Sequence, residues 1–168
     1  MTDRSVVHST FTLEGAYVAP IARVFRAWAE PAAKARWFSP DGHHELDFRV
    51  GGRELNRSSN PDGQVLTSES HYHDIVVDQR IAYTSTLSVG ESVVTVSLTT
   101  VELTTGGDAT RLVLTEHGAF LDGHEQPGWR EQGTSDWLDA LGAELEHGPD
   151  AGPSSQVNDP LNPGGSTP

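Results

Sequence analysis

The amino-acid sequence predicts one α+β domain in which a curved antiparallel sheet of about six or seven strands wraps around a long C-terminal helix. Three observations predict it. Segments with alternating apolar and polar residues dominate from about residue 45 to residue 117, two short helical segments follow the first strand, and one long amphipathic segment ends the folded part. Helices that are segregated from an antiparallel sheet are typical of a layered α+β fold.

The N-terminal part predicts one strand and two short helices. Phe11 and Leu13 alternate with polar residues in a strand near His8–Val18. Pro20 stands at the start of the first helix and Pro31 starts the second, where a missing backbone N–H costs nothing. The apolar stripe of the first helix consists of Ile21, Val24, Phe25 and Trp28, and the second helix ends near Trp37 and Phe38.

The following strands are separated by turn signals. Asn60-Pro61-Asp62-Gly63 has proline at the second and glycine at the fourth position of a type I turn, and Gly51-Gly52 indicates a bend or bulge. Gly90-Glu91 and Gly106-Gly107-Asp108 indicate compact hairpin connections. Strands are therefore expected at Glu45–Val50, on both sides of the Asn60–Gly63 turn, and at Ser68–Val77, Arg80–Val89, Ser92–Leu103 and Thr110–His117.

One strand contains a change of phase. Its apolar residues occupy even positions up to Leu98 and odd positions from Val101 onward. Because side chains of a strand alternate with a period of two, this change predicts a bulge or sharp bend at Thr99-Thr100. Such a bend allows a sheet to curve around a helix or a ligand.

The last helix is expected from about Gly128 to Glu146. Trp137, Leu141 and Leu145 follow helical spacing, and Leu138 widens this apolar stripe. The sequence after it is rich in Gly, Pro, Ser and Asn and cannot bury enough surface to offset its ordering entropy. We therefore expect a folded domain over residues 1–147 and a disordered tail over residues 148–168.

Composition excludes several classes of site and partner. The chain has 168 residues, no cysteine and a formal net charge of −13. The absence of cysteine excludes disulfides, thiolate catalysis and cysteine-ligated zinc, and the negative charge disfavours nucleic acid as a partner. No secretory signal and no apolar run of eighteen residues is visible, which predicts a cytoplasmic protein without a membrane-spanning helix.

Motifs along most of the chain resemble a known family. The sequence is similar to the START-like (SRPBCC, helix-grip) superfamily, and in detail to its branch named after the activator of the heat-shock-protein ATPase. The resemblance spans roughly Ser9 to His147. It rests on Ala19-Pro20, Val24-Phe25-Arg26-Ala27-Trp28, Pro31, Trp37-Phe38-Ser39-Pro40, Asp47-Phe48-Arg49-Val50-Gly51-Gly52, Pro61-Asp62-Gly63, Arg80-Ile81-Ala82-Tyr83-Thr84, Thr110-Arg111-Leu112-Val113-Leu114, Gly133-Thr134 and Trp137-Leu138-Asp139-Ala140-Leu141.

The resemblance implies a scaffold shared by lipid carriers, hormone receptors, polyketide cyclases and dehydratases, and co-chaperones. Fold alone does not decide among these functions. The first hypothesis is therefore a binding protein for a small apolar molecule. The alternatives are an enzyme of the cyclase or dehydratase kind, without a metal or nucleotide cofactor, and a co-chaperone-like interaction module, which the lack of residues for a second chaperone-binding domain disfavours.

Residues expected to line a ligand cavity are mostly aromatic. They are Trp37, Phe38, Phe48, Tyr72, Tyr83, Glu116 and Trp137. If Glu116 rather than His117 points inward, its carboxyl group lies in an apolar pocket with a raised pKa and can act as an acid or base. His71 and His73 share a strand face and could be metal ligands, but solvated histidines are the expected reading, so no metal and no other cofactor is predicted.

Overall fold

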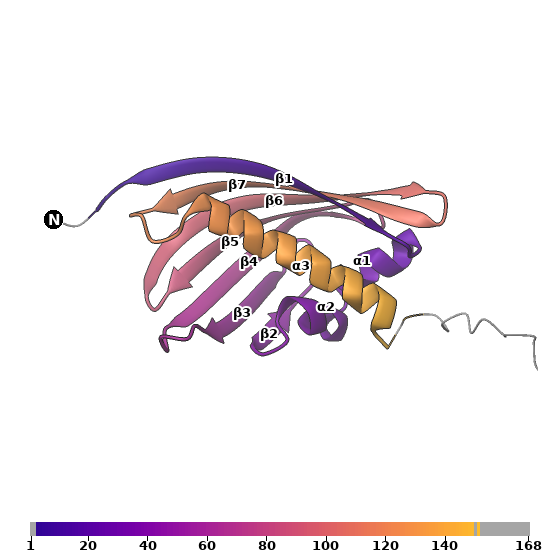
Figure 1. The fold of residues 1–168 in the computed structure, drawn as a ribbon, viewed down its shortest axis with the longest axis horizontal. Coiled ribbons are helices and arrows are strands. Elements are labelled where there is room, and N and C mark those ends of the chain that lie inside the picture. The colour runs from indigo at the N-terminus through magenta and orange to yellow at the C-terminus, as the bar shows by residue number, and fades with distance from the viewer. Residues whose placement is uncertain (1–2, 150, 152–168) are drawn as a thin grey trace, which may run out of the picture.

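The computed structural model describes residues 3–149 and residue 151, and its strands form one curved antiparallel sheet (Figure 1). The strand order across the sheet is β1-β7-β6-β5-β4-β3-β2. The elements are β1 (Val6–Tyr17), α1 (Ile21–Ala29), α2 (Pro31–Phe38), β2 (His43–Leu46), β3 (Arg53–Ser59), β4 (Val65–Val76), β5 (Arg80–Val89), β6 (Ser92–Gly106), β7 (Ala109–Leu121) and α3 (Pro127–His147). The predicted fold class is thus confirmed.

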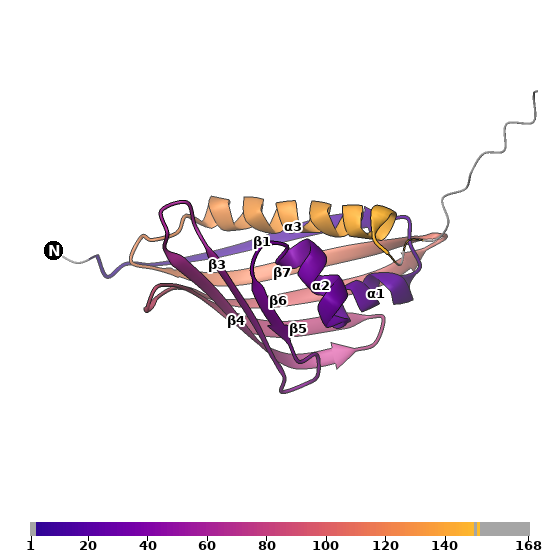
Figure 2. The same ribbon diagram turned by 90° about the horizontal axis from the view of Figure 1, so that it is seen from below.

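Helix α3 lies along the concave side of the sheet, and α1 and α2 lie beside its C-terminal half (Figures 1 and 2). Leu138, Leu141 and Leu145 form the buried stripe of α3. They belong to the same apolar core as Val24 of α1 and Val101 of β6. Thr134 is the buried residue in the N-terminal half of α3.

The turn at Gly51-Gly52 precedes β3 and is held against β4 by two backbone hydrogen bonds. The Gly51 N–H donates to the carbonyl of Tyr72 at 2.8 Å, and the Tyr72 N–H donates to the carbonyl of Gly52 at 3.1 Å. Gly51 has φ of 83°, a conformation that favours glycine. Because these bonds hold the chain in a turn, the predicted strand Glu45–Val50 is wrong in its second half, and β2 ends at Leu46.

The predicted bulge at Thr99-Thr100 is also wrong. Thr99 pairs with Tyr83 on one side and with Glu116 on the other, without a break in register. The shift of register lies instead between Leu87 and Ser88 of β5, and a second one lies between Tyr72 and Asp74 of β4.

The inner face of β6 therefore keeps to odd positions from Thr95 onward. Thr95, Ser97 and Thr99 are buried there, whereas Val96 and Leu98 remain 44% and 43% exposed on the outer face. The apparent change of phase at Thr99-Thr100 therefore reflects a polar inner face at this end of the strand. The extra residue of β6 is Val94, because Leu87 pairs with Thr95 and Ser88 pairs with Val93.

No described helix is long and apolar enough to cross a membrane. The predicted tail, residues 148–168, lies outside the described residues except for Gly148, Pro149 and Ala151.

Candidate ligand-binding site

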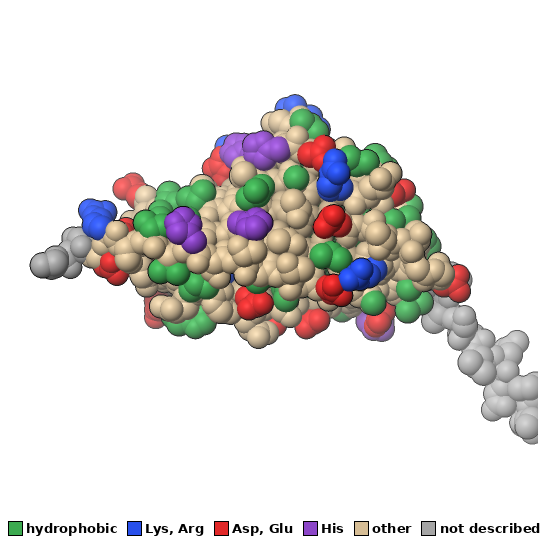
Figure 3. Space-filling model, turned by 90° about the horizontal axis from the view of Figure 1, so that it is seen from above, with side chains coloured by type: hydrophobic (Ala, Val, Ile, Leu, Met, Phe, Trp, Pro, Cys, Tyr) green, Lys and Arg blue, Asp and Glu red, His purple; other side chains and the backbone are tan. Residues whose placement is uncertain are grey.

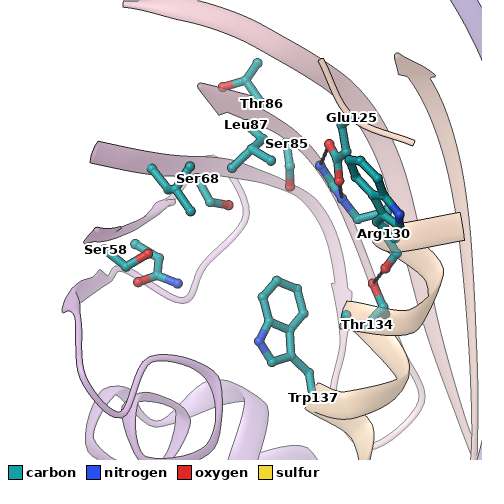
Figure 4. A pocket seen from close by; sticks show the side chains of 13 residues that line it. Ser58, Ser68, Ser85, Thr86, Leu87, Glu125, Arg130, Thr134 and Trp137 are labelled. Carbon is teal, nitrogen blue, oxygen red and sulfur yellow. Dashed lines mark hydrogen bonds and ion pairs between the residues drawn. The ribbon is translucent and has the colours of Figure 1, made fainter. Parts of the chain in front are cut away.

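An open cleft lies between the N-terminal half of α3 and strands β3, β4 and β5 (Figure 4). It encloses about 230 Å³. The strands contribute small hydroxyl side chains and two leucines, Leu66 and Leu87, and the helix contributes Trp129 and Trp137. This mixture of apolar walls with a few polar groups is typical of small-molecule sites.

Gly133 has no side chain, so the space beside this part of α3 stays open. Gly133 lines the cleft, and a Cβ atom built on it would meet no atom within 4 Å. Trp137 follows one turn later, projects toward the strands in Figure 4, and packs on Phe38 with ring centroids 4.5 Å apart. Its side chain is 36% exposed, so it forms a wall of the cleft and is not part of the buried stripe of α3.

An ion-pair cluster closes one end of the cleft (Figure 4). The guanidinium group of Arg130 donates from Nε to Oε1 of Glu125 at 2.8 Å and from Nη2 to Oε2 at 3.0 Å. Its Nη1 lies 3.4 Å from Oε1 of Glu116, and Thr95 donates to Glu125. Burial lowers the pKa of Arg130, but the two carboxylates outweigh it and raise that pKa.

Glu116 of β7 points inward. His117 points outward, and its Nδ1 atom lies at hydrogen-bond distance, 2.8 Å, from the hydroxyl oxygen of Thr10. Burial raises the pKa of Glu116, and the nearby Glu125 adds to this effect; Arg130 and the Thr99 hydroxyl oppose it without cancelling it. Glu116 therefore keeps its proton to a higher pH than an ordinary carboxyl group.

A small inner hollow of about 20 Å³ lies beside the cleft. Thr134 and Trp137 line both spaces. Five of the seven residues expected at the cavity line this hollow: Trp37, Phe38, Tyr83, Glu116 and Trp137. Trp137 alone of the seven also lines the larger cleft.

The other two expected residues line neither space. Phe48 packs against Phe25 and Tyr72 at centroid distances of 5.7 Å and 5.1 Å. Tyr72 is 2% exposed, and its hydroxyl donates to Oε1 of Glu54 at 2.8 Å. Both side chains belong to the packed part of the interior.

A lysine lies among the aromatic residues that the sequence suggested for a cavity. The Nζ atom of Lys34, in α2, donates to Oε1 of Glu54 at 2.8 Å, and these side chains are 1% and 3% exposed. Four aromatic rings surround the ammonium group: Phe38 at 4.6 Å, Trp28 at 5.0 Å, Trp37 at 5.8 Å and Tyr83 at 5.9 Å from Nζ to the ring centroids. Cation–π attraction of this kind strengthens when the cation is desolvated.

Glu54 of β3 is the acceptor at the centre of this network. Its Oε2 lies 2.7 Å from Nε2 of His44, whose side chain is 3% exposed. Burial raises the pKa of Glu54, but the charge of Lys34 and the hydrogen bonds from His44, Lys34 and Tyr72 outweigh it and hold that pKa at about 2. The phenol pKa of Tyr72 is raised by burial and by Glu54.

Sequence reasoning missed Lys34, Glu54, His44, Glu125, Trp129 and Arg130. One signal was available, because Lys34 is the only lysine of the chain while arginine occurs ten times. The other residues are brought together by pairings between distant segments, which leave no local pattern. Within residues 3–149 and 151, no group of three His, Cys, Asp or Glu side chains could hold a metal ion. His8, His71, His73 and His117 are exposed, and histidines gather on the face seen in Figure 3.

A family model described as Activator of Hsp90 ATPase homolog 1-like protein matches residues 18–146. This segment includes both short helices, six of the seven strands and nearly all of α3. The chain belongs to the Activator of Hsp90 ATPase homolog 1-like family. The family suggested by the sequence motifs is thereby confirmed.

Solved structures of two rhizobial proteins resemble this family member closely. One is an uncharacterized protein from Rhizobium leguminosarum, 43% identical, with a TM-score of 0.83; the match covers 86% of this chain and 99% of that one. The other is Mll3558 from Rhizobium loti, 45% identical, with a TM-score of 0.79; it covers 84% of this chain and 99% of that one.

More distant structures share the fold alone. CalU16 from Micromonospora echinospora is 19% identical, with a TM-score of 0.61, and the match covers 88% of this chain and 87% of that one. No match was found among functionally curated proteins.

Proposed function

We propose that this protein binds a small, mainly apolar molecule in the cleft between α3 and strands β3 to β5. The observation that carries the proposal is the cleft itself, an open space of about 230 Å³ whose helical wall consists of Trp129, Gly133 and Trp137. The family and the fold support a START-like ligand-binding domain. An uncharged ligand fits best, because Glu125 and Arg130 at the end of the cleft already neutralise each other.

The tryptophans give the ligand its binding surface. Trp129 is 66% exposed and Trp137 is 36% exposed, so both rings have apolar area left to bury against a ligand. Hydroxyl groups such as those of Ser68 and Ser85 provide the polar contacts that fix orientation. We expect dissociation constants in the micromolar range, about −8 kcal/mol, for an uncharged aromatic ligand.

The test fills the cleft from its helical wall. In Gly133→Leu the new side chain enters open space, and replacing glycine inside a helix gains roughly 0.5–1 kcal/mol of stability. N-phenyl-1-naphthylamine, an uncharged dye that fluoresces in apolar surroundings, should bind the wild-type chain one to one. We expect at least a tenfold weaker binding to Gly133→Leu without a lower melting temperature.

The matched control is Gly128→Leu. Gly128 lies on the same helix, has the same free space around its Cβ position and does not line the cleft. This variant should bind the dye as the wild type does. Equal dye binding by wild type and Gly133→Leu would place the dye elsewhere and refute the proposal.

A second candidate function is acid–base catalysis, with Glu116 as the acid or base at the inner hollow beside the cleft. Glu116 is a buried carboxyl group with a raised pKa on the wall of an aromatic hollow, which is the usual setting of a catalytic acid or base. If a ligand retained by the purified protein is converted on incubation, Glu116→Gln should abolish the conversion and keep the binding. Mass spectrometry of the ligand pool before and after incubation distinguishes a carrier from an enzyme.

A further inference from the structure

Two residues that line the inner hollow, Trp28 and Glu116, have polar atoms that can form further hydrogen bonds. Trp28 lines it, and the indole Nε1 of Trp28 is buried without a hydrogen-bond partner in the described part of the chain. A buried N–H donor without an acceptor costs about 1–3 kcal/mol. Glu116 lines the same hollow, and its Oε1 has long contacts, 3.3 Å to the Thr99 hydroxyl and 3.4 Å to Nη1 of Arg130.

The size of the hollow suits one polar atom. Its volume of about 20 Å³ is slightly more than a single water molecule requires, which is about 10–15 Å³ on the same kind of measure. Its other walls include the rings of Trp37, Phe38 and Tyr83, which exclude bulk water from that atom. Phe38 and Trp37 also face the Lys34 ammonium, so a second cation in the hollow would be repelled.

We propose that the inner hollow is a subsite for a carbonyl oxygen of the bound ligand, which accepts hydrogen bonds from Trp28 Nε1 and from the protonated carboxyl group of Glu116. This inference rests on the function proposed above. The ligand is then an uncharged aromatic or alicyclic ketone, or a similar carbonyl compound, whose ring system lies in the outer cleft. Its oxygen passes beside Trp137, which lines both spaces and is partly exposed.

The groups around Glu116 only partly offset the effect of its burial on its pKa. Arg130 of α3 faces it but is bound to both oxygens of Glu125, and Lys34 is neutralised by Glu54. Tyr83 of β5 is also nearby, and burial, together with the charge of Glu116, raises the pKa of its phenol. From β6 the hydroxyls of Thr99 and Ser97 face the carboxyl group, and from β1 its register partner is the apolar Phe11. Burial dominates this balance and raises the pKa of Glu116.

The direction of the pH effect follows from this arrangement. Only the protonated carboxyl group can donate to a carbonyl oxygen, so affinity for a ketone falls as the pH rises through the pKa of Glu116. By linkage, the bound ketone raises that pKa further. A ligand of the same shape without the oxygen has no such dependence.

The experiment compares 2-acetylnaphthalene with 2-isopropenylnaphthalene, which replaces the carbonyl oxygen by a CH₂ group. Both are uncharged, and their affinities are measured by displacement of N-phenyl-1-naphthylamine between pH 5 and pH 9. The ratio of the two affinities cancels any general effect of pH on the cleft. We expect this ratio to favour the ketone at low pH and to fall about fivefold as Glu116 ionises, the effect of one hydrogen bond.

Variants of Glu116 and Trp28 show how much each donor contributes to the preference for the ketone. Glu116→Gln keeps an N–H donor at every pH, so the ratio should stay in favour of the ketone and lose its pH dependence. Trp28→Phe should lower the ratio at every pH and keep the pH dependence. Trp129→Phe removes ring area from the outer cleft and should weaken both compounds alike. The exposed Glu131→Gln on the same helix is the charge control and should change nothing.

Two results would overturn the subsite: a ratio near one at all pH values in the wild type, or a pH-dependent ratio that survives in Glu116→Gln. If the dye itself does not bind, the proposed function has failed and the subsite with it. If the dye binds but neither compound displaces it, the cleft remains a ligand site and the carbonyl subsite is refuted. Binding of both compounds with equal affinity would leave the cleft as a ligand site and refute only the carbonyl subsite.

Discussion

Lys34 and Glu54 form a buried ion pair whose contribution to stability depends on pH. The pKa of Glu54 is about 2 in the folded protein, below its ordinary value of 4.5. A depressed pKa contributes stability that is fully present above about pH 4.5 and is lost as the pH falls toward 2. The difference corresponds to about 3 kcal/mol. We predict that the free energy of unfolding, measured with urea, falls by about this amount between pH 6 and pH 2.5.

Variants separate this pair from the other carboxyl groups. Glu54→Gln should cost about 3–5 kcal/mol at pH 7, because it leaves the Lys34 charge buried without a counter-ion. Adding Lys34→Met should recover most of that loss. The double variant should also lose less stability on acidification than the wild type. If its unfolding free energy falls as steeply with acid as that of the wild type, the pair is not the acid-sensitive group.

The position of Lys34 could not be predicted from its neighbours. It lies between two alanines in a short helix, and lysine is almost never fully buried unless it is paired. Its partner Glu54 is twenty residues away, on a strand. The sequence did predict that aromatic residues gather here, and Trp37, Phe38 and Tyr83 do lie together. The single lysine in the composition marked Lys34 as unusual, but it did not show that the ammonium group lies among these rings.

At the scale of elements, α3 has two functions along its length. Its C-terminal half buries Leu138, Leu141 and Leu145 in the core, while its N-terminal half carries Trp129 and Gly133 on the wall of the cleft. The sequence suggested that Trp137 belongs to the gripping face, because Trp137, Leu141 and Leu145 share helical spacing. The buried face instead runs through Thr134, Leu138, Leu141 and Leu145, so Trp137 lies beside it and is free to line the cleft.

The two halves should respond differently to truncation. Leu141 is 0% exposed, so Leu141→Ala should lower the free energy of unfolding by about 2–5 kcal/mol. Trp137 is partly exposed, so Trp137→Ala should cost less than Leu141→Ala and weaken dye binding. Urea titration and dye binding of both variants test this. Equal losses of stability would mean that Trp137 supports the fold as much as the leucines do.

The sequence predicted where strands β5 and β6 lie, but not which face of β6 points inward. Strand β5 was predicted with its observed bounds, Arg80–Val89. In β6 the inward residues Thr95, Ser97 and Thr99 are polar, and the outward Val96 and Leu98 are apolar. Periodicity shows which residues share a face but not which face is inside. The sequence therefore could not predict that hydroxyl side chains of β6 line the interior near Glu116.

For the whole molecule, apolar packing and ligand space are segregated between two ends of one sheet. The C-terminal half of α3, with α1 and α2, covers the apolar end, and the cleft lies at the polar end. The inner hollow lies between them, because Trp28 and Leu138 of the core line it together with Glu116. The order of elements alone predicted this architecture, because an antiparallel sheet closed by a single long helix has few ways to bury its concave face. Which end stays open depends on side chains such as Gly133, whose role is visible only in three dimensions.

We predict that the folded domain ends with α3. The family model ends at residue 146 and α3 ends at His147, and every residue of the described core lies at or before Leu145. Residues 152–168 contain few large apolar side chains and many of Gly, Pro, Ser and Asn, so we predict from composition that the domain does not need them. A chain ending at Ala151 should therefore melt within about 2 °C of the full chain and bind the dye with unchanged affinity, measured by calorimetry and by dye titration. A chain ending at Leu141 is the positive control, because it removes Leu145 and should unfold at a clearly lower temperature. A loss of more than a few degrees in the first variant would show that the segment after α3 stabilises the domain.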